Sequence, residues 1–524
     1  MTATLIPLTS QPDPPQSARL ATATLAAASV GADVDLPPIG PALISIGIVH
    51  FGIGAFHRAH QAVFTEDAMA ATGQTSWGIL GVTGRSEAVV EQLQPQNCLY
   101  GVLEKGADAP ALRIVGAVRD VAWPGRDSEK VIEMLARPST HIATLTITEK
   151  GYLRGADGDL NLSLPVVQHD VALLEREIAG EAGLPASISP LGLLVRGLAR
   201  RFRQGGEPFT VLPCDNLVDN GTITHRLVTS FVAAVGRGQA AARDDLLAWL
   251  AASVTFPSTM VDRIAPATTE ADRQLEGGLL GLRDDALVVA EPFKQWVIED
   301  RFAGPRPRWE QVGAILTSDV APYERAKLRI LNATHSLLAY LGALCGHSTI
   351  AQAMTNPMLR DLARRVIDED ILPTLVTPVG MDLAVYRDSV LKRFGNPNLP
   401  HTTRQVAMDG SQKLPNRILG SVQDRLQQGE TPEGLALAVA AWITYVASTI
   451  GGDTILDDPL AELLQATIGD ADAVRTDPNG VVQRMLALGQ IFPQAVQQSV
   501  AFHDAVRQQL FTVQTIMRAA RAQA

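Results

Sequence analysis

An apolar strand that leads through a Gly-x-Gly turn into a helix is the feature that most restricts how this chain can fold. Residues Ile44 to Val49 form a short β-branched run that is typical of a buried strand. Gly52 and Gly54 follow it, and the pattern from Gln61 to Met69 predicts a helix. In this arrangement backbone N–H groups and a helix N-terminus can meet a pyrophosphate. The segment therefore favours an α/β domain that binds a dinucleotide.

The turn by itself identifies neither a cofactor site nor a cofactor. His57 stands where the common fingerprint has its third glycine, and many strand-to-helix turns carry Gly-x-Gly for steric reasons alone. The second predicted strand, Trp77 to Val82, is not followed at once by the Asp or Glu that usually binds the ribose of NAD. Arg85 comes soon after this strand and could accept the 2′-phosphate of NADP or stack on the adenine. Both cofactors stay open on physical grounds.

Two further predicted strands end in polar segments. Ile142 to Thr148 runs into Glu149 and Lys150, and Thr210 to Pro213 runs into Cys214-Asp215-Asn216. Because ligands in open α/β sheets collect outside the carboxyl ends of the strands, we expect both segments to face one crevice. An ordinary loop with Asx turns would explain the same residues. Two later runs also have the pattern of strands: Leu287 to Glu291 and Trp296 to Asp300.

After about residue 317 the pattern changes from strands to long helices. We therefore predict a loosely ordered arm over residues 1–40, an α/β domain over 41–316 and an all-α domain over 317–524. A cleft between the two domains would be the natural place for a ligand. The helical patterns cover residues 323–343, 357–371, 380–394, 415–428, 432–450, 458–468, 480–490 and 495–522.

The first of these helices carries an unusual set of polar residues on one side. Residues 323–341 contain no Gly or Pro, and Lys327, Asn332 and His335 stand at i, i+5 and i+8. At about 100° per residue they lie near 0°, 140° and 80° around an α-helix, with Glu324 near 60°. Burying such groups costs several kcal/mol unless they are partnered, so they are typical of a functional site. The alternative is an amphipathic helix whose lysine extends to solvent and whose Asn and His make ordinary buried hydrogen bonds.

These residue types together suit the removal of a proton from a secondary alcohol while a hydride leaves its carbon. Lys327 can act as a base near neutral pH if burial lowers the pKa of its ammonium group. The Asn332 amide can donate to a developing alkoxide or carbonyl oxygen. His335 can hold a neighbouring hydroxyl, and Glu324 can pass protons to solvent.

Composition excludes several kinds of partner. The net charge of −11 gives no electrostatic reason to expect a nucleic acid or an anionic membrane. Three scattered cysteines are too few for a disulfide framework or a zinc site, so we expect a reduced, cytoplasmic setting and no bound metal. The uncharged run from Leu435 to Ile450 is short for a membrane span, and the helix start before it favours a buried helix. The expected partner is a small molecule, bound by a monomer or a small homo-oligomer.

Short motifs are spread over nearly the whole chain after residue 44. They are Gly52-x-Gly54-Ala55-Phe56-His57-Arg58-Ala59-His60-Gln61, Thr148-Glu149-Lys150-Gly151-Tyr152, Cys214-Asp215-Asn216-Leu217, Phe256-Pro257-x-x-Met260-Val261-Asp262-Arg263-Ile264, Glu291-Pro292-Phe293, Lys327-x₄-Asn332-x₂-His335 and Asp409-Gly410-Ser411-x-Lys413. In this order they resemble the mannitol dehydrogenase family, the zinc-independent long-chain dehydrogenases of polyols and sugar acids. The resemblance implies a Rossmann-type N-terminal domain and a helical C-terminal domain that supplies the catalytic helix.

The resemblance also implies roles for individual residues. Lys327 would be the general base in alcohol oxidation and the acid in ketone reduction. Asn332 and Asn216 would form an oxyanion hole, His335 would orient the substrate, and Glu324 would relay protons.

The binding residues follow from the same motifs. Arg404 and Lys413 match, less closely, the substrate-binding cations of the family, although each taken alone is more simply a surface cation, and Asp262 lies in a matching motif. The expected cofactor-binding residues are Gly52, Gly54, Phe56, His57, Arg58, Arg85, Glu149 and Lys150. NAD is the expected cofactor because family members mostly use it, and the missing acidic residue after Val82 leaves NADP open.

Residues Gln405 to Pro415 look most like the branch called fructuronate reductase or mannonate oxidoreductase, which interconverts D-mannonate and D-fructuronate. Mannitol 2-dehydrogenase is the second expectation, and arabinitol and sorbitol dehydrogenases are more distant. A non-catalytic sugar or nucleotide sensor would be expected to have lost Lys327, Asn332 or His335, and all three are present. A zinc alcohol dehydrogenase would need a close Cys/His ligand cluster, which the sequence lacks.

Overall fold

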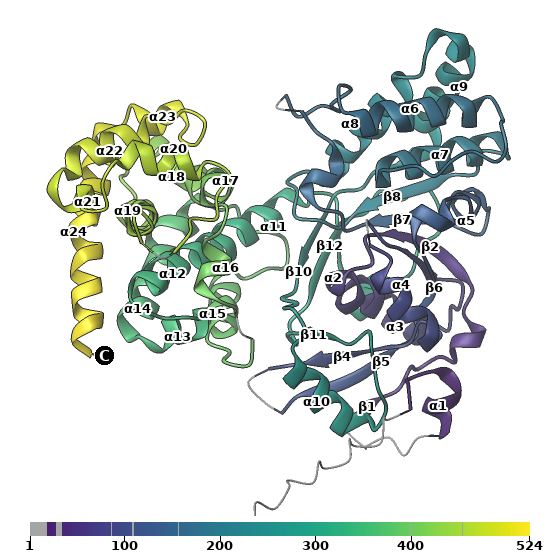
Figure 1. Cartoon of the computed structure of the whole chain (residues 1–524), viewed down its shortest axis with the longest axis horizontal. Coiled ribbons are helices and arrows are strands. Elements are labelled where there is room, and N and C mark those ends of the chain that lie inside the picture. The colour runs from purple at the N-terminus through teal and green to yellow at the C-terminus, as the bar shows by residue number, and fades with distance from the viewer. Residues whose placement is uncertain are drawn as a thin grey trace, which may run out of the picture. The chain divides into compact units, whose positions relative to one another are not determined.

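The computed structural model describes residues 18–27, 34–84, 86–106, 109–155, 157–399, 401–452 and 454–523. The chain divides into two compact units (Figure 1). The first holds the described residues up to Lys105 and from Ala109 to Ser318, and the second holds Gly106 and the described residues from Asp319 onward. The first is an α/β unit and the second is helical, which confirms the predicted fold class.

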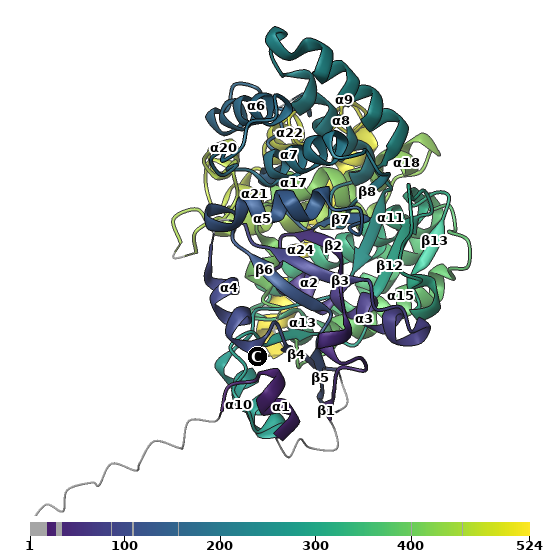
Figure 2. The same ribbon diagram turned by 90° about the vertical axis from the view of Figure 1, so that its right-hand side faces the viewer.

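Six parallel strands form the central sheet of the first unit. In spatial order they are β6 (Val118–Ala122), β3 (Gly78–Val82), β2 (Ile46–Phe51), β7 (Ile142–Leu145), β8 (Phe209–Pro213) and β9 (Val254–Thr255). Figure 2 gives the clearest view of β2 between β3 and β7. The strand order changes direction at β2, so its carboxyl end lies at the switch point where open α/β sheets bind ligands.

Helices cover this sheet on both faces, which is why most side chains of its central strands β2, β3, β7 and β8 are apolar and buried. Along β2 the side chains alternate between two cores, because Val49 and Phe51 pack into one hydrophobic cluster and Ile48 packs into the other. The helices of the unit are α1 (Thr22–Ala27), α2 (Ala55–Ala59), α3 (Gln61–Thr72), α4 (Ala88–Leu93), α5 (Pro124–Ala136), α6 (Pro165–Ile178), α7 (Pro190–Arg203), α8 (Asn220–Ala233), α9 (Ala240–Ser253) and α10 (Glu270–Leu280). Side chains of α5 and α7 enter the first cluster, and those of α3 enter the second.

Two smaller sheets complete the unit. One has the order β1 (Val34–Asp35), β5 (Ala111–Val115), β4 (Tyr100–Glu104) and β11 (Val288–Ala290). The other has the order β10 (Thr259–Asp262), β12 (Gln295–Glu299) and β13 (Ile315–Thr317). β11 lies in the predicted run Leu287 to Glu291, and β12 overlaps the predicted run Trp296 to Asp300 with a shift of one residue, whereas β4, β5 and β6 were not predicted.

Part of the expected N-terminal arm packs against the α/β unit. Leu20 is fully buried in a cluster with Leu99 and Leu280, and β1 pairs with β5. Burying a leucine side chain stabilises a fold by roughly 1.5–3 kcal/mol, which gives this segment a physical reason to be ordered. Residues 1–17 and 28–33 lie outside the described residues, so the expectation of a loose arm stays a prediction there.

The second unit is built from helices around α12 (Ala333–Leu344) and α19 (Glu433–Ser448), which pack together, and α19 also packs along α24 (Val500–Gln523). α19 is buried over most of its length, as the apolar run predicted. Among the helices that the structure describes, none combines the length and the apolar character needed to cross a membrane. The α-helices are α11 (Ala321–Ala326), α12 (Ala333–Leu344), α13 (Ile350–Thr355), α14 (Pro357–Arg365), α15 (Leu383–Phe394), α16 (Thr403–Ala407), α17 (Gly410–Leu414), α18 (Gly420–Gln427), α19 (Glu433–Ser448), α20 (Ala461–Ile468), α21 (Ala473–Thr476), α22 (Pro478–Leu486), α23 (Gln494–Gln497) and α24 (Val500–Gln523), with π-helical stretches at Lys327–Asn332, Val366–Ile371 and Pro415–Leu419.

Candidate active site

The turn after β2 has a backbone that only glycine adopts easily. Gly52 has φ +97°, and a Cβ placed there would lie 2.3 Å from the carbonyl oxygen of Thr146. The N–H groups of Gly52 and Ile53 both donate to the carbonyl of Val82, at 2.8 and 3.2 Å. Gly52 is therefore required by the packing of β2 against its neighbouring strands, whether or not a ligand is bound.

Gly54 is different, because the protein itself leaves room for a side chain there. Its φ is −81° and its ψ is −172°, which any residue can adopt. Among the described residues, the nearest atom to an added Cβ is the Gly52 carbonyl oxygen at 3.8 Å. The open space beside a strand-to-helix turn fits a pyrophosphate that approaches the backbone closely, so the residues present suit a dinucleotide.

Two of the predicted cofactor residues lie inside the fold. His57 is buried, and its ring stacks on that of His50 with centroids 3.3 Å apart. Arg58 is also buried and donates to the Ala286 carbonyl and, at 3.3 Å, to the Gly54 carbonyl. Phe56 is half-buried and stacks on His60 at 5.0 Å. His57 and Arg58 therefore support the turn from within, and contact with a cofactor stays a prediction.

The remaining cofactor predictions lie near the carboxyl end of β7 or outside the described residues. Glu149 and Lys150 begin a short 3-10 helix, Glu149–Tyr152, and both are exposed. Arg85 lies outside the described residues, so its suggested contact with a ribose phosphate or an adenine is untested.

Asn216 follows β8 and is exposed on the same edge of the sheet. The residue before it, Asp215, accepts a hydrogen bond from the hydroxyl of the buried Tyr152. The Asn220 amide donates to the Asp215 carbonyl at 3.3 Å and to the Thr259 carbonyl at 3.0 Å. Burial raises the pKa of Asp215 to about 7, against the effect of the Tyr152 hydrogen bond. The loop that carries Asn216 is thus held at both ends.

Asp262 ends β10 and is buried, with 5% of its surface exposed. Its neighbour Arg263 is a structural residue, since its guanidinium donates to the Glu291 carbonyl at 2.9 Å and pairs with Glu104. The predicted role of Asp262 in substrate binding is not tested by these contacts.

The helix that carries Lys327, Asn332 and His335 is not a regular α-helix, and this corrects the angles expected from the sequence. Residues Lys327–Asn332 form a π-helix, in which the Ala333 N–H donates to the Leu328 carbonyl five residues earlier. In such a turn, residues five positions apart lie about one turn apart. The angle around the helix axis between Lys327 and Asn332 is therefore smaller than the 140° expected for a regular α-helix. Single π-helical turns within α-helices are frequent at functional sites.

Lys327 is buried, with 8% of its surface exposed, and it is the first residue of the π-helix. Glu324 lies in the first turn of α11 and is half-buried. A buried lysine at a π-helical turn is an uncommon structural arrangement, and such turns are frequent at functional sites, so Lys327 is a candidate functional residue.

His335 lies in the first turn of α12, and its ring stacks on Phe394 at 4.8 Å and on His401 at 5.4 Å. Its Nε2 is buried and has no hydrogen-bond partner among the described residues. Burial is the main reason that its pKa lies well below the ordinary value, and the nearby charges of His401 and Arg417 act in the same direction. His335 is therefore a neutral imidazole with one ring nitrogen available to a substrate hydroxyl.

The two predicted substrate cations differ in environment. Arg404 is exposed on α16. Lys413 lies on α17, and its Nζ donates to the Val406 carbonyl at 3.3 Å. Burial lowers the pKa of Lys413 to about 8, and the neighbouring Arg417 lowers it further while Asp409 raises it.

Arg417 is a further candidate site residue, which the sequence motifs did not indicate. Its guanidinium donates to the Ser336 hydroxyl at 3.1 Å and to the Asn332 carbonyl at 3.5 Å, so it contacts the helix that carries Lys327 and His335 directly. It stands four residues after Lys413 along a continuous helical stretch, and that spacing is the signal that could have found it.

The structure therefore brings part of the predicted site together. Glu324, Lys327, Asn332 and His335 share one continuous helical segment, and Lys413 lies close enough to His335 to affect its pKa. Arg404 also belongs to the helical unit, and Arg85 lies outside the described residues. The remaining predicted residues belong to the α/β unit: Asn216, Asp262, Gly52, Gly54, Phe56, His57, Arg58, Glu149 and Lys150.

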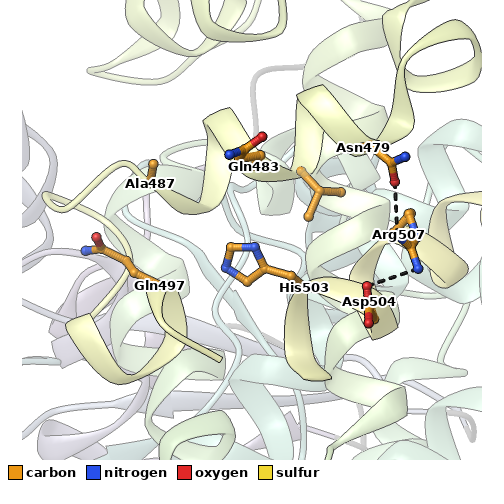
Figure 3. A pocket seen from close by; sticks show the side chains of 8 residues that line it. Asn479, Gln483, Ala487, Gln497, His503, Asp504 and Arg507 are labelled. Atoms are coloured by element: carbon orange, nitrogen blue, oxygen red, sulfur yellow. Dashed lines mark hydrogen bonds and ion pairs between the residues drawn. The ribbon is translucent and has the colours of Figure 1, made fainter. Parts of the chain in front are cut away.

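The described residues hold no group of three or more His, Cys, Asp or Glu side chains that could bind a metal ion. A pocket of about 460 Å³ lies between α22 and α24 and is lined by none of the predicted site residues (Figure 3). The guanidinium group of Arg507, which lines this pocket, pairs with Asp504 at 3.0 Å and donates to Asn479 at 3.1 Å, so it is bound by neighbouring side chains. The chemistry expected from the sequence therefore does not involve this pocket.

Comparisons with known proteins cover almost the whole chain. Residues 46–311 match the mannitol dehydrogenase Rossmann domain, and residues 319–514 match the mannitol dehydrogenase C-terminal domain. The D-mannonate oxidoreductase of Escherichia coli (strain K12) is 42% identical over 470 residues, which are 88% of this chain and 91% of that protein. The mannitol 2-dehydrogenase of Pyrenophora tritici-repentis is 35% identical over 427 residues, which are 80% of this chain and 73% of that protein. The structure of Pseudomonas fluorescens mannitol 2-dehydrogenase in a ternary complex with NAD and D-mannitol is 33% identical, with a TM-score of 0.80 over 97% of this chain and 100% of that chain.

Proposed function

Because this chain belongs to the mannitol dehydrogenase family, whose members are oxidoreductases of polyols and sugar acids, we propose that it transfers a hydride between NAD and a secondary alcohol of an open-chain sugar acid. The proposed substrate pair is D-mannonate and D-fructuronate, and the reaction needs no metal ion. The proposal includes a cytoplasmic location and a monomer or small homo-oligomer.

The observation that carries this proposal is the position of Lys327. A buried ammonium group at an irregular turn, with an amide about one turn later and a neutral imidazole beyond it, is suited to moving one proton at one oxygen atom. The nicotinamide, when bound, accepts or supplies the hydride at its C4. In alcohol oxidation the neutral Lys327 amine takes the hydroxyl proton, and in ketone reduction the Lys327 ammonium returns it to the oxygen.

Two amides would stabilise the negative charge that develops on the substrate oxygen. Asn332 and Asn216 are the proposed donors, and such preorganised donors contribute about 2.7–4 kcal/mol each to the transition state in other enzymes. His335 would hold an adjacent hydroxyl through its Nε2, which is buried and lacks a hydrogen-bond partner among the described residues. Glu324 would pass the proton between Lys327 and solvent.

The choice of a sugar acid rests on the positive groups near His335 and on the comparisons. Lys413, Arg417 and Arg393 all lie close enough to His335 to lower its pKa. Together with Arg404 they favour a substrate with a carboxylate, and the Escherichia coli relative is named D-mannonate oxidoreductase. D-Mannitol and D-fructose are the second candidate pair, because the Pseudomonas fluorescens relative was solved with D-mannitol.

NAD is the proposed cofactor because the structure of that relative contains it. NADP remains the alternative, since no Asp or Glu directly follows β3.

The test is the oxidation of NADH with D-fructuronate and D-fructose offered separately, repeated with NADPH. We expect turnover with NADH and D-fructuronate and a clear preference over D-fructose. A preference for D-fructose would move the protein to the mannitol branch with the same proposed catalytic residues. Binding of NADH without turnover of any polyol or sugar acid would instead favour a non-catalytic sensor, and inactivation by a strong chelator would contradict a metal-independent mechanism.

A further inference from the structure

A buried histidine, His50, lies in β2 two residues before Gly52, the first glycine of the proposed cofactor-binding turn. His50 is the fifth residue of β2 and is fully buried between two threonines, Thr144 in the neighbouring strand β7 and Thr146 just after that strand. Its Nδ1 is 2.7 Å from the Thr144 hydroxyl, and its Nε2 is 2.9 Å from the Thr146 hydroxyl. The Thr146 hydroxyl also lies 2.8 Å from the carbonyl oxygen of Gly52, the first glycine of the turn.

The direction of each hydrogen bond in this chain follows from the chemistry of its ends. The Gly52 carbonyl can only accept a hydrogen bond, so the Thr146 hydroxyl donates its single proton to it. Thr146 must then accept from His50, which places the imidazole proton on Nε2. The Nδ1 of His50 is left as an acceptor for the Thr144 hydroxyl. Thr144, His50, Thr146 and Gly52 thus form one directed chain of hydrogen bonds.

This direction requires His50 to be neutral, and its surroundings keep it so. Burial lowers the pKa of His50 to about 3 and outweighs the effect of the Gly52 backbone, which acts in the opposite direction. The stacked ring of His57 is also neutral at neutral pH, since burial and then the neighbouring His50 hold its pKa well below the ordinary value. The other groups close to His57 are Gln61, His60 and Arg58, and none of them is an acid that would favour a charged imidazole.

The end of the chain is the peptide that sets the shape of the turn. The Gly52 carbonyl accepts from the Thr146 hydroxyl and, at 2.6 Å, from the Gly54 N–H. Because Gly52 has φ +97°, its peptide plane is held away from the usual strand orientation. The two hydrogen bonds to the Gly52 carbonyl fix the orientation of its peptide plane. The position of Gly54, two residues later, depends on that orientation.

On the basis of the proposed function, we propose that His50 and Thr146 are positioning residues for the cofactor, which hold the Gly52 peptide in the orientation that lets a dinucleotide pyrophosphate approach Gly54. They act through the backbone of the turn and need not touch the cofactor. The ordinary alternative is that His50 only fills space between the sheet and α2.

The discriminating experiment compares Thr146→Val with Thr146→Ser in the full-length protein. Valine keeps the shape of threonine but removes the hydroxyl, so we expect the dissociation constant for NADH to rise about tenfold, which is the usual effect of losing such a bond. The kcat at saturating NADH should stay within about twofold of wild type, because the proposed catalytic groups lie elsewhere. Serine keeps the hydroxyl, so Thr146→Ser should restore NADH binding. Equal NADH binding by the valine and serine variants would overturn the positioning role.

A second measurement keeps the inference testable if Thr146→Val folds poorly. Nitrogen-15 NMR of histidine-labelled protein should show one buried imidazole protonated at Nε2 only, with no titration above about pH 5, consistent with its lowered pKa. Thr144→Val should weaken this preference and raise the NADH dissociation constant by a smaller factor, about two- to fivefold. An Nδ1-protonated His50 in the wild type would overturn the inference. A wild-type protein that binds neither NADH nor NADPH would instead overturn the proposed function, and the positioning role with it.

Discussion

The Tyr152 phenol donates a hydrogen bond to the Asp215 carboxylate, and this contact joins the segments that follow β7 and β8. Tyr152 is fully buried and closes the short helix that begins with Glu149. Asp215 precedes Asn216, the proposed oxyanion donor of the α/β unit. The contact therefore couples a segment expected to face the cofactor with the residue expected to face the substrate oxygen.

Asp215 should make the stability of the protein depend on pH in an unusual direction. Its pKa is about 7 in the folded state because of burial, against an ordinary value of 3.8. Between these two pH values the folded protein holds a proton that the unfolded chain releases, so stability falls as the pH rises through this window. We expect the thermal midpoint of wild type to decrease relative to that of Asp215→Asn from about pH 4 to about pH 7. Parallel curves would show that Asp215 does not titrate in this range.

Replacement of Lys327 by alanine should separate catalysis from cofactor binding. Loss of a general acid–base group typically lowers turnover by about 10² to 10⁴-fold, and we expect Lys327→Ala to lose activity in that range. NADH binding, measured by fluorescence titration, should be unchanged because Lys327 belongs to the helical unit. Lys392→Ala is the matched control, since this exposed lysine lies on α15 of the same unit. An unchanged kcat in the Lys327 variant would refute the assignment.

Lys413 should make recognition of a charged substrate sensitive to alkaline pH. Its pKa is lowered to about 8, mainly by burial, so its positive charge is lost as the pH rises through that value. The KM for D-fructuronate should therefore rise above about pH 8, whereas the KM for the uncharged D-fructose should not. Lys413→Arg keeps a charge over this range and should flatten the profile, because arginine stays protonated. Lys413→Met should give a high KM at every pH, and a pH-dependent KM that survives in this variant would point to another group.

The two glycines of the turn should respond differently to alanine. At Gly54 the protein leaves space for a Cβ, so the thermal midpoint of Gly54→Ala should equal that of wild type. Its dissociation constant for NADH should rise by about tenfold or more, because the added methyl group would block one contact between the backbone and the pyrophosphate. At Gly52 the Cβ would meet the Thr146 carbonyl oxygen at 2.3 Å, and φ is +97°. Gly52→Ala should therefore destabilise the fold by about 1–3 kcal/mol or more, whether or not NADH is present. Differential scanning calorimetry with and without NADH separates the two effects, and equal NADH affinity in Gly54→Ala and wild type would argue against a pyrophosphate beside Gly54.

Much of the fold could be predicted from the sequence because its strongest local patterns agree with the structure. The strand before Gly52 is short but rich in β-branched residues, and helix α19 is a long apolar run, so local propensity and burial point to the same answer in both. The sequence did not indicate β5, because a charged residue, Arg113, stands at its centre. In the folded protein Arg113 pairs with Glu66 and Asp67, both from α3, and no local pattern could reveal these partners.

The candidate site was only partly predictable for a related reason. The residues of the proposed catalytic helix stand close in the sequence, and the helical pattern was enough to group them. Arg417 and His401 reach His335 only through the packing of other helices, and the partners of His50 depend on the register between β2 and β7, in which His50 pairs with Thr144. These relationships are set by tertiary structure, so spacing alone could not supply them.

The π-helical turn at Lys327–Asn332 explains why four residues, and not three, separate the lysine from the asparagine in this motif. In a regular α-helix, two side chains share a face when three residues separate them, and a fourth intervening residue swings one away by about 100°. The wide turn absorbs that extra residue without a loop. The four-residue gap between Lys327 and Asn332 therefore specifies the backbone irregularity as much as the chemistry, and a substitution that forced a regular helix here would part the two side chains without altering either of them.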